Sequence, residues 1–244
     1  MIPKSEIKYI QTLFQKKFRD AEGLYLAEGP KILDEARGAV PAAIQKIFGL
    51  DTWINQNRSF YPGVEMNVVA EFELEKISQL KTPNQVVAVM AQPVVTGAID
   101  TRGALVLVLD GIQDPGNLGT IVRIADWFGV PQVVCSRDCA DIYSAKVVQA
   151  TMGSLFRVPV HYTELSAWVG AQKGTPVYGA VLNGTPLKQV QNVAGGILVI
   201  GNESKGIRPK VEALLTEKIT IEKTGGAESL NAAVATGILL AHLK

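Results

Sequence analysis

The feature that most constrains the fold of this 244-residue chain is a regular alternation of short apolar runs with helix-compatible stretches after residue 104. The runs are rich in Val, Ile and Leu and are continuous, which is typical of strands that are buried on both faces. The expected strands are residues 105–109, 132–135, 158–161, 177–182, 197–200 and 219–221. This pattern predicts an α/β fold with a parallel sheet covered by helices on both faces.

The stretches between these runs favour helices. The expected helices are residues 118–128, 145–151, 163–169, 209–215 and 230–243. Trp127 and Phe128 end the first of them beside Ile124, and we expect both aromatic rings in the core. The last helix is rich in Ala, with Thr236 and Gly237 in its middle, so its narrow surface suits close packing against another backbone.

The first part of the chain has a different pattern, in which short strands and helices mix. The expected strands are residues 24–27, 44–50, 64–69 and 86–91, and the expected helices are 30–37, 53–57 and 71–80. The segment 92–103 contains Pro, two Gly and little periodicity, as linkers do. We therefore expect a small α/β domain over residues 1–95, a linker over 96–103 and a second domain over 104–244.

The charge of the chain is uneven. The formal net charge is only +1, which argues against a protein that binds nucleic acid through bulk charge. The first twenty residues nevertheless carry five cations against two acids, interleaved with apolar residues at helical spacing. This amphipathic helix is either a solvated surface helix or one that contacts phosphates. The candidate contacts are Lys8, Lys16, Lys17 and Arg19.

Composition narrows the class of protein. A hydrophobic fraction of 47% with mixed charges excludes a disordered or fibrous chain. No apolar stretch is long enough to span a membrane, and the first residues lack the apolar region of a secretory signal. Cys135 and Cys139 are too few for a disulfide framework or a zinc site, so we expect no metal. A cytoplasmic location is expected.

The loop after the first strand of the second domain is the first candidate for chemistry. Ligands bind beyond the carboxyl ends of the strands in such sheets. Asn117 opens the following helix there, and Arg123 is a cation on an otherwise apolar helix. An ion pair with Asp126 is the structural alternative for Arg123. The glycine fingerprint of dinucleotide-binding enzymes is absent, which weighs against a nicotinamide-dependent enzyme.

Two later loops follow strands and are rich in glycine. In the first, a buried strand runs into Gly201, and Glu203 follows it directly. In the second, Ser229 and Asn231 precede the last helix, where either side chain would also serve as an ordinary helix cap. Each loop alone is a weak signal, because polar turns of this composition are common.

Taken together, the three loops resemble the motifs of the SpoU/TrmH family of RNA 2′-O-ribose methyltransferases, within the SPOUT superfamily. The family patterns are N-x-G-x-x-x-R, then G-x-E-x-x-G, then S-L-N before the last helix. The matching residues, motif by motif, are Asn117, Gly119 and Arg123, then Gly201, Glu203 and Gly206, then Ser229, Leu230 and Asn231. Residues 141–156 also resemble the family's connecting segment, with Gln149 where many members carry Arg. Residues 24–30 are similar to the start of its L30e-like RNA substrate-binding domain.

The resemblance implies a trefoil-knotted second domain that binds S-adenosylmethionine mainly through backbone groups. The residues it assigns to the cofactor are Ile200, Gly201, Ile221, Leu230 and Asn231. It assigns a central catalytic role to Arg123. A guanidinium stays protonated at neutral pH and therefore does not readily accept a proton as a base. We expect Arg123 instead to bind the phosphate and ribose of the target nucleotide. The residues expected to organise the site around it are Asn117, Glu203, Ser229 and Asn231.

The family also implies partners. Its members complete each site across a subunit interface, so a homodimer through the C-terminal domain is expected. The expected substrate is structured RNA, with ribosomal RNA of the 23S type favoured over transfer RNA. The alternative function is a non-catalytic RNA-binding or ribosome-assembly protein that retains the fold. The intact motifs argue against that alternative.

Overall fold

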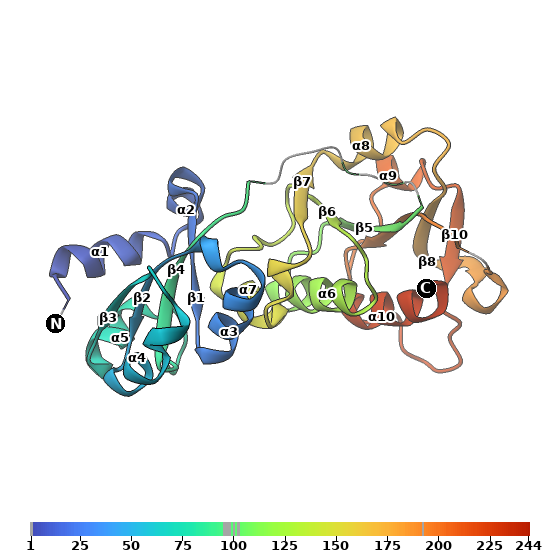
Figure 1. Cartoon of the computed structure of the whole chain (residues 1–244). Coiled ribbons are helices and arrows are strands. Elements are labelled where there is room, and N and C mark those ends of the chain that lie inside the picture. Colours follow the sequence, from blue (N-terminus) through green and yellow to red (C-terminus); the bar gives the residue numbers. More distant parts are fainter. Residues whose placement is uncertain (1, 95–98, 100, 102, 192) are drawn as a thin grey trace. The chain divides into compact units, whose positions relative to one another are not determined.

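The computed structural model describes residues 2–94, 99, 101, 103–191 and 193–244 (Figure 1). The chain divides into two compact units, and each is described by itself. Unit 1 comprises residues 1–94 together with 141–156, and unit 2 comprises residues 95–140 together with 157–244. The predicted linker, residues 96–103, falls largely outside the described residues.

Unit 1 is built on a four-stranded mixed sheet with the strand order β1-β4-β2-β3. Strand β4 runs antiparallel to β1 and β2, whereas β2 and β3 are parallel. The strand bounds are β1 Leu24–Glu28, β2 Ile44–Gly49, β3 Glu65–Val68 and β4 Val86–Ala91. All four lie where the apolar runs predict strands.

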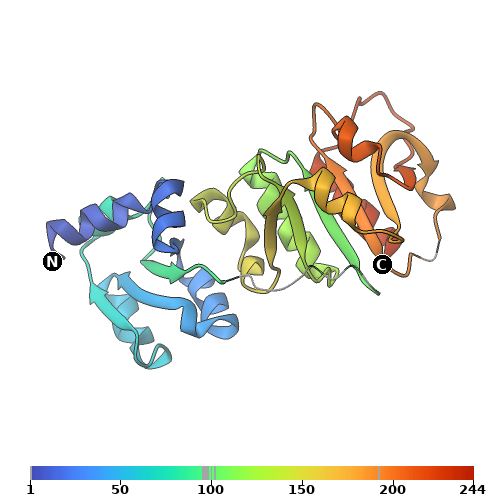
Figure 2. The ribbon, with the colours of Figure 1, turned by 90° about the horizontal axis from the view of Figure 1, so that it is seen from above.

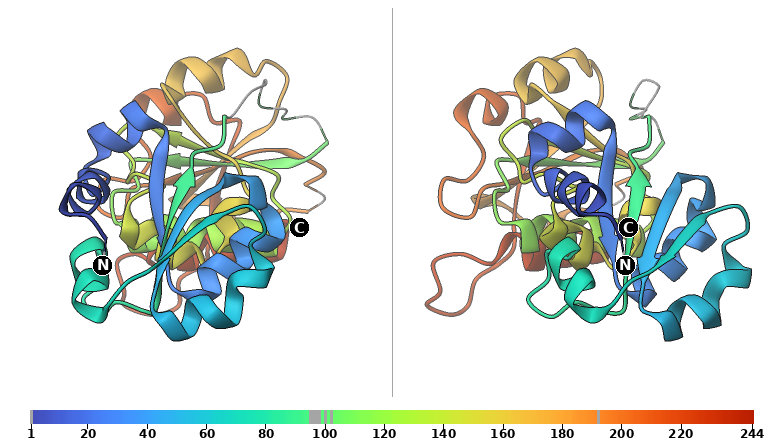
Figure 3. Two further views of the ribbon diagram at one scale, coloured as in Figure 1. Left: turned by 60° about the vertical axis from the view of Figure 1, so that its left-hand side comes forward. Right: turned by 90° about the vertical axis from the view of Figure 1, so that its left-hand side faces the viewer.

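Helices cover both faces of this sheet (Figure 3). Their bounds are α1 Lys4–Thr12, α2 Lys16–Glu22, α3 Pro30–Ala39, α4 Asp51–Asn57, α5 Glu71–Ile77 and α7 Ala145–Thr151, with short 3-10 turns at Pro41–Ala43, Arg58–Phe60 and Ser154–Phe156. One core joins α3, α4 and α7 to the sheet, and a second joins α1 and α5 to its other face. The single helix expected over the first twenty residues is thus two helices, separated by a turn at residues 13–15.

The segment 141–156 packs with unit 1, although the predicted boundary assigns it to the second domain. The ring of Tyr143 lies 4.6 Å from that of Tyr25, and Val148 is part of the unit 1 core. Gln149 donates a hydrogen bond of 2.7 Å from Nε2 to the carbonyl oxygen of Glu28. Gln149 therefore ties this segment to β1. The helical periodicity of residues 145–151 predicts the helix, but it does not indicate that this helix packs into the core of unit 1.

Unit 2 confirms the predicted parallel sheet. Its six strands have the order β10-β8-β9-β5-β6-β7, and every neighbouring pair is parallel. The bounds are β5 Leu105–Asp110, β6 Val133–Ser136, β7 Val160–Thr163, β8 Val177–Pro186, β9 Gly196–Gly201 and β10 Glu217–Thr220. Strand β5 lies inside the sheet and is buried at all of its positions, which explains its continuous run of Leu and Val.

The helices of unit 2 lie on both faces of the sheet, with α6 and α10 on one face and α8 and α9 on the other (Figure 1). Their bounds are α6 Pro115–Trp127, α8 Leu165–Ala171, α9 Pro209–Glu212 and α10 Ala232–Leu243, with a 3-10 turn at Leu187–Gln189. Helices α6 and α10 are neighbours (Figure 2), and the Cα of Gly237 faces Ile124. Within the described part of the chain, no helix has the length and apolar character that crossing a membrane requires.

The expectation that Trp127 is a core residue is wrong. Its side chain is 85% exposed, although it ends an apolar helix. Helix α6 buries the stripe that contains Leu118, Ile121, Val122 and Ala125, and Trp127 falls outside that stripe. An apolar residue at helical spacing can therefore mark an outer face.

Glu73 stabilises the start of unit 1. Its carboxylate accepts hydrogen bonds from the backbone N–H groups of Ala70, at 3.0 Å, and Ile2, at 2.9 Å. These bonds lower the pKa of Glu73. We expect Glu73→Gln to reduce the free energy of unfolding by about 1–2 kcal/mol at neutral pH, because one charge-assisted acceptor is lost.

The pH dependence of this effect has a definite sign. A lowered native pKa stabilises the fold above the unfolded pKa of about 4.3, and this stabilisation disappears as the pH falls through the native value. The difference between variant and wild type should therefore shrink in urea unfolding at about pH 3. Glu75→Gln, on the exposed side of the same helix, is the control. An equal difference at both pH values would contradict the assignment.

Candidate active site

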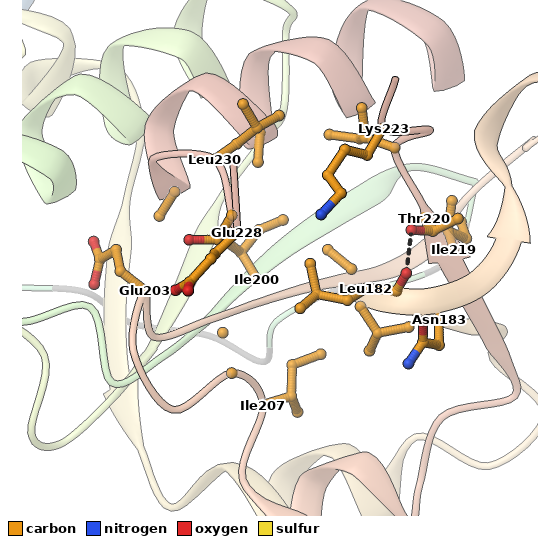
Figure 4. Close-up of a pocket in the computed structure, with 18 of the residues that line it drawn as sticks. Leu182, Asn183, Ile200, Glu203, Ile207, Ile219, Thr220, Lys223, Glu228 and Leu230 are labelled. Atoms are coloured by element: carbon orange, nitrogen blue, oxygen red, sulfur yellow. Dashed lines mark hydrogen bonds between the residues drawn. The ribbon is translucent and has the colours of Figure 1, made fainter. Parts of the chain in front are cut away.

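A cavity of about 800 Å³ opens in unit 2 where strands β8, β9 and β10 end (Figure 4). Its walls come from β8, from the ends of β9 and β10, from α10, and from two loops, residues 202–207 and 221–230. The second loop stands out from the body of the unit (Figure 3). A cavity of this volume suits a ligand of nucleoside size or larger, and its position is the usual one for parallel sheets.

Four of the five residues predicted to bind a cofactor line this cavity. Ile200 and Gly201 end β9, while Ile221 and Leu230 lie on the loop that follows β10. Asn231 is not among the lining residues. Its Oδ1 instead accepts hydrogen bonds from the N–H groups at the start of α10, so it acts as the helix cap.

The loop after β9 requires glycine at its first position. A Cβ on Gly201 would lie 2.3 Å from the carbonyl carbon of Gly206, so only glycine permits this approach. Asn202 and Gly206 exchange two backbone hydrogen bonds, of 3.1 and 2.9 Å, which close the loop. The side chain of Asn202 then donates to the carbonyl oxygen of Gly111, at 2.8 Å, and joins the loop to the end of β5.

An ion pair anchors the far end of the same loop. Asp110, the last residue of β5, is buried, and its carboxylate accepts hydrogen bonds from the backbone N–H of Arg208, at 2.8 Å, and from its Nε, at 2.5 Å. This contact raises the pKa of Arg208. The cavity wall between Gly201 and Arg208 is therefore attached to β5 at both ends.

Three of the predicted catalytic residues meet beside the cavity. Asn117 Nδ2 donates to Glu203 Oε1 at 2.5 Å, and Asn231 Nδ2 donates to Asn117 Oδ1 at 2.8 Å. Helix α6 presents Asn117 because Asp114 caps its first turn and Pro115 begins it. We call this chain of three side chains the Asn–Glu–Asn network. Residues that are far apart in the sequence meet here because parallel strands end at one edge of the sheet.

Ser229 and Arg123 lie differently from this network. Ser229 lines the cavity next to Leu230. Arg123 is exposed on α6 and is not among the residues that line the cavity. In the described part of the chain, no hydrogen bond or ion pair engages its guanidinium. The alternative of an ion pair with Asp126 is not supported, because Asp126 pairs with Arg157 at 2.8 Å.

Some cavity residues carry no motif and were missed in the sequence. Leu182 and Asn183 come from β8, and Thr220 Oγ1 donates to the carbonyl oxygen of Leu182 at 3.0 Å. Lys223 and Glu228 project from the loop after β10 (Figure 4). The available signal is that strands beside a motif-bearing strand also end at the site.

The two cysteines are buried, and Cys139 contacts the loop that follows β5. Cys135 lies in β6, one residue before its end, and Cys139 lies in the turn that follows. Burial raises the pKa of Cys135, whereas hydrogen bonds, the largest contribution being that of Cys135, lower the pKa of Cys139 to about 7. Cys139 Sγ accepts from the backbone N–H of Ile112 at 3.3 Å, so it supports the loop from inside.

The predicted RNA-contacting cations of unit 1 divide into two groups. Lys8, Lys16 and Lys17 are exposed. Arg19 is buried, and its guanidinium binds the carboxylate of Asp141 at 2.5 Å as well as two backbone carbonyl groups. Arg19 is therefore structural, and its assignment to RNA is wrong. Arg19 is the one residue of α2 that is buried.

Comparison with known proteins gives a consistent result for both units. Residues 104–241 match the SpoU rRNA Methylase family, and residues 4–88 match the MRM3-like substrate binding domain. The chain is 34% identical over 247 aligned positions to a Bacillus subtilis protein named 23S rRNA (guanosine(2553)-2′-O)-methyltransferase RlmP, covering 98% of this chain and 96% of the relative.

Solved structures agree with this result. A putative RNA methyltransferase of the TrmH family from Porphyromonas gingivalis superposes with a TM-score of 0.87 at 35% identity, covering 100% of this chain and 98% of its own. The AdoMet-bound rRNA methyltransferase from Sinorhizobium meliloti superposes with a TM-score of 0.87 at 27% identity, covering 100% and 95%.

Proposed function

The chain belongs to the SpoU rRNA methylase family, and on that premise we propose that it is an S-adenosylmethionine-dependent enzyme that methylates a ribose 2′-hydroxyl of ribosomal RNA. The observation that carries this proposal is the Asn–Glu–Asn network, which joins the three family motifs beside a cavity of nucleoside size. A protein that only bound RNA would have no need for this arrangement.

The cavity suits the cofactor. Ile200, Ile219, Leu182 and Leu230 offer apolar surface for a flat adenine ring, and the strand ends offer backbone groups for its polar edge. Gly201 leaves the backbone accessible, since any side chain there would clash with the adjoining loop. When bound, S-adenosylmethionine supplies an electrophilic methyl group.

The protein must hold the ribose in line and assist loss of the 2′-hydroxyl proton. We assign Arg123 to the phosphate and ribose of the target nucleotide, because its charge is constant and its donors form a planar fork. Asn117 keeps one orientation because Glu203 and Asn231 bind both ends of its amide. The network thus provides fixed polar groups at the place where the hydroxyl must approach.

We also propose that the enzyme is a homodimer that uses the exposed face of α6 and α10. Trp127 is 85% exposed, and Val234 and Ile238 are 52% and 39% exposed one turn apart on α10. Arg123 lies one turn before Trp127 on the same face. Large apolar side chains gathered in this way are typical of a protein interface. A partner seated here would bring Arg123 to a cavity that it does not reach within its own chain.

Trp127→Lys tests the dimer. We expect the variant to sediment as a monomer and to lose methyl transfer by about 10²-fold, because a charged side chain replaces the largest apolar group of the interface. Phe72→Lys, at another exposed aromatic residue, which belongs to unit 1, should remain dimeric and active. Analytical ultracentrifugation measures both variants. A dimeric Trp127→Lys protein would contradict the assignment of this face.

Further proposals follow from the family. We infer that the chain end threads through the loop after β9 as a trefoil knot, which the cavity loops 202–207 and 221–230 would form together.

Unit 1 would bind structured RNA through Lys8, Lys16 and Lys17, in keeping with its match to a substrate-binding domain. A cytoplasmic location accords with a ribosomal RNA substrate.

The function is tested by incubating the wild-type protein with labelled S-adenosylmethionine and total cellular RNA. We expect label in the large ribosomal RNA, and mapping of 2′-O-methyl groups with the gene deleted and restored should identify one nucleotide. Binding of RNA and cofactor without any transfer would instead favour the non-catalytic alternative.

A further inference from the structure

In the described part of the chain, three charged side chains that line the cavity form no hydrogen bond or ion pair: Lys205 on the loop after β9, and Lys223 and Glu228. Lys223 and Glu228 both lie on the loop between β10 and α10, and Figure 4 shows both directed into the cavity. Lys218, at the edge of the same cavity, donates instead to Glu212 at 2.5 Å. A free cation and a free anion that face one cavity fit a ligand that carries both charges.

The two charges enter different parts of the cavity. Glu228 lies on the side of Glu203, whereas Lys223 lies on the side of Leu182 (Figure 4). Glu203 is bound to Asn117, so the Glu203 side is where the methyl group has to meet the hydroxyl. The sulfonium of the cofactor carries that methyl group. Its α-carboxylate lies at the far end of a short carbon chain.

We propose that Glu228 recognises the sulfonium of S-adenosylmethionine and that Lys223 recognises the α-carboxylate of its methionyl tail. This inference rests on the proposed function and adds the residues that bind the charged groups of the cofactor. The ammonium of Lys223 can donate a charge-assisted hydrogen bond to the carboxylate. The sulfonium has no hydrogen to donate, so the carboxylate of Glu228 attracts it by charge alone.

This assignment separates the two cofactor forms. Methyl transfer removes the positive charge of the sulfonium but leaves the carboxylate, so S-adenosylhomocysteine lacks only the group assigned to Glu228. Glu228 therefore favours the methyl donor over the spent product and assists release of the product after transfer. Lys223 holds both forms equally.

Isothermal titration calorimetry of the full chain with three probes tests each half of the proposal. The probes are S-adenosylmethionine, S-adenosylhomocysteine and methylthioadenosine, which has neither the sulfonium nor the amino-acid tail. Glu228→Gln should weaken S-adenosylmethionine about tenfold and leave S-adenosylhomocysteine within about twofold. Lys223→Met should weaken both by the same factor of about ten and leave methylthioadenosine unchanged.

The matched control is Lys210→Met, which removes an exposed lysine of α9 that does not line the cavity. Its affinities should stay within about twofold of wild type for all three probes. The proposal is overturned if Glu228→Gln weakens both cofactor forms equally, or if Lys223→Met affects methylthioadenosine as strongly as the others. A wild-type protein that methylates RNA while both variants bind normally rejects this inference alone. A wild-type protein that binds no S-adenosylmethionine rejects the proposed function itself.

Discussion

Replacing Arg123 with alanine should reduce methyl transfer by about 10³-fold while cofactor affinity stays within about twofold of wild type. The guanidinium is exposed, and no acidic side chain in the described part of the chain binds it, so its loss leaves no buried charge behind. It does not line the cofactor cavity either. The expected loss is therefore one of nucleotide positioning and transition-state stabilisation.

Single-turnover transfer to ribosomal RNA, measured beside calorimetric binding of S-adenosylmethionine, separates these effects. Arg137→Ala, which removes another exposed arginine of unit 2, should transfer methyl groups at the wild-type rate. Arg123→Lys should recover only part of the activity, because an ammonium cannot form the planar pair of bonds that a phosphate accepts. Retained turnover in Arg123→Ala would exclude this residue from the chemistry.

Arg208→Met should lower the free energy of unfolding of unit 2 by about 3 kcal/mol. The carboxylate of Asp110 is buried, and Arg208 is the cation that binds it, so the substitution leaves an uncompensated charge in the interior. Cofactor affinity should also fall, by about tenfold, since the wall of the cavity between Gly201 and Arg208 loses one of its attachments.

A double-mutant cycle distinguishes the ion pair from simple loss of packing. In the background Asp110→Asn, the further change Arg208→Met should cost less than about 1 kcal/mol, because the neutral amide no longer needs a cation. Urea unfolding followed by circular dichroism measures all four proteins. Equal costs of Arg208→Met in both backgrounds would contradict the pairing.

Local patterns in the sequence predict most elements of the fold. Strand β4 begins and ends where its apolar run does, and the parallel sheet of unit 2 follows from strands that are apolar on both faces. The three motifs also name the residues of the Asn–Glu–Asn network. These features are predictable because strand and helix periodicities are local, and because a motif reflects chemistry that needs the same residue types in every member.

Other outcomes depended on contacts that local patterns do not contain. Arg19 looks like a surface cation until Asp141, far along the chain, is seen to bind it. Trp127 looks like a core residue until the buried stripe of α6 is seen to exclude it. Gln149 differs from the Arg that many family members carry, and only its contact with Glu28 shows that it ties its helix to β1. In each case the partner or neighbour of the side chain decides its role.

By itself, then, the sequence determined the order of strands and helices, the parallel arrangement of the second sheet and the three loops that carry chemistry. Only the tertiary structure decided that residues 141–156 join unit 1, that Leu182 and Asn183 share the cavity, and that Lys223 and Glu228 face it with no partner among the described residues. The physical reason is the parallel sheet: its strands all end at one edge, so residues far apart in sequence meet there, and spacing along the chain does not encode which of them do.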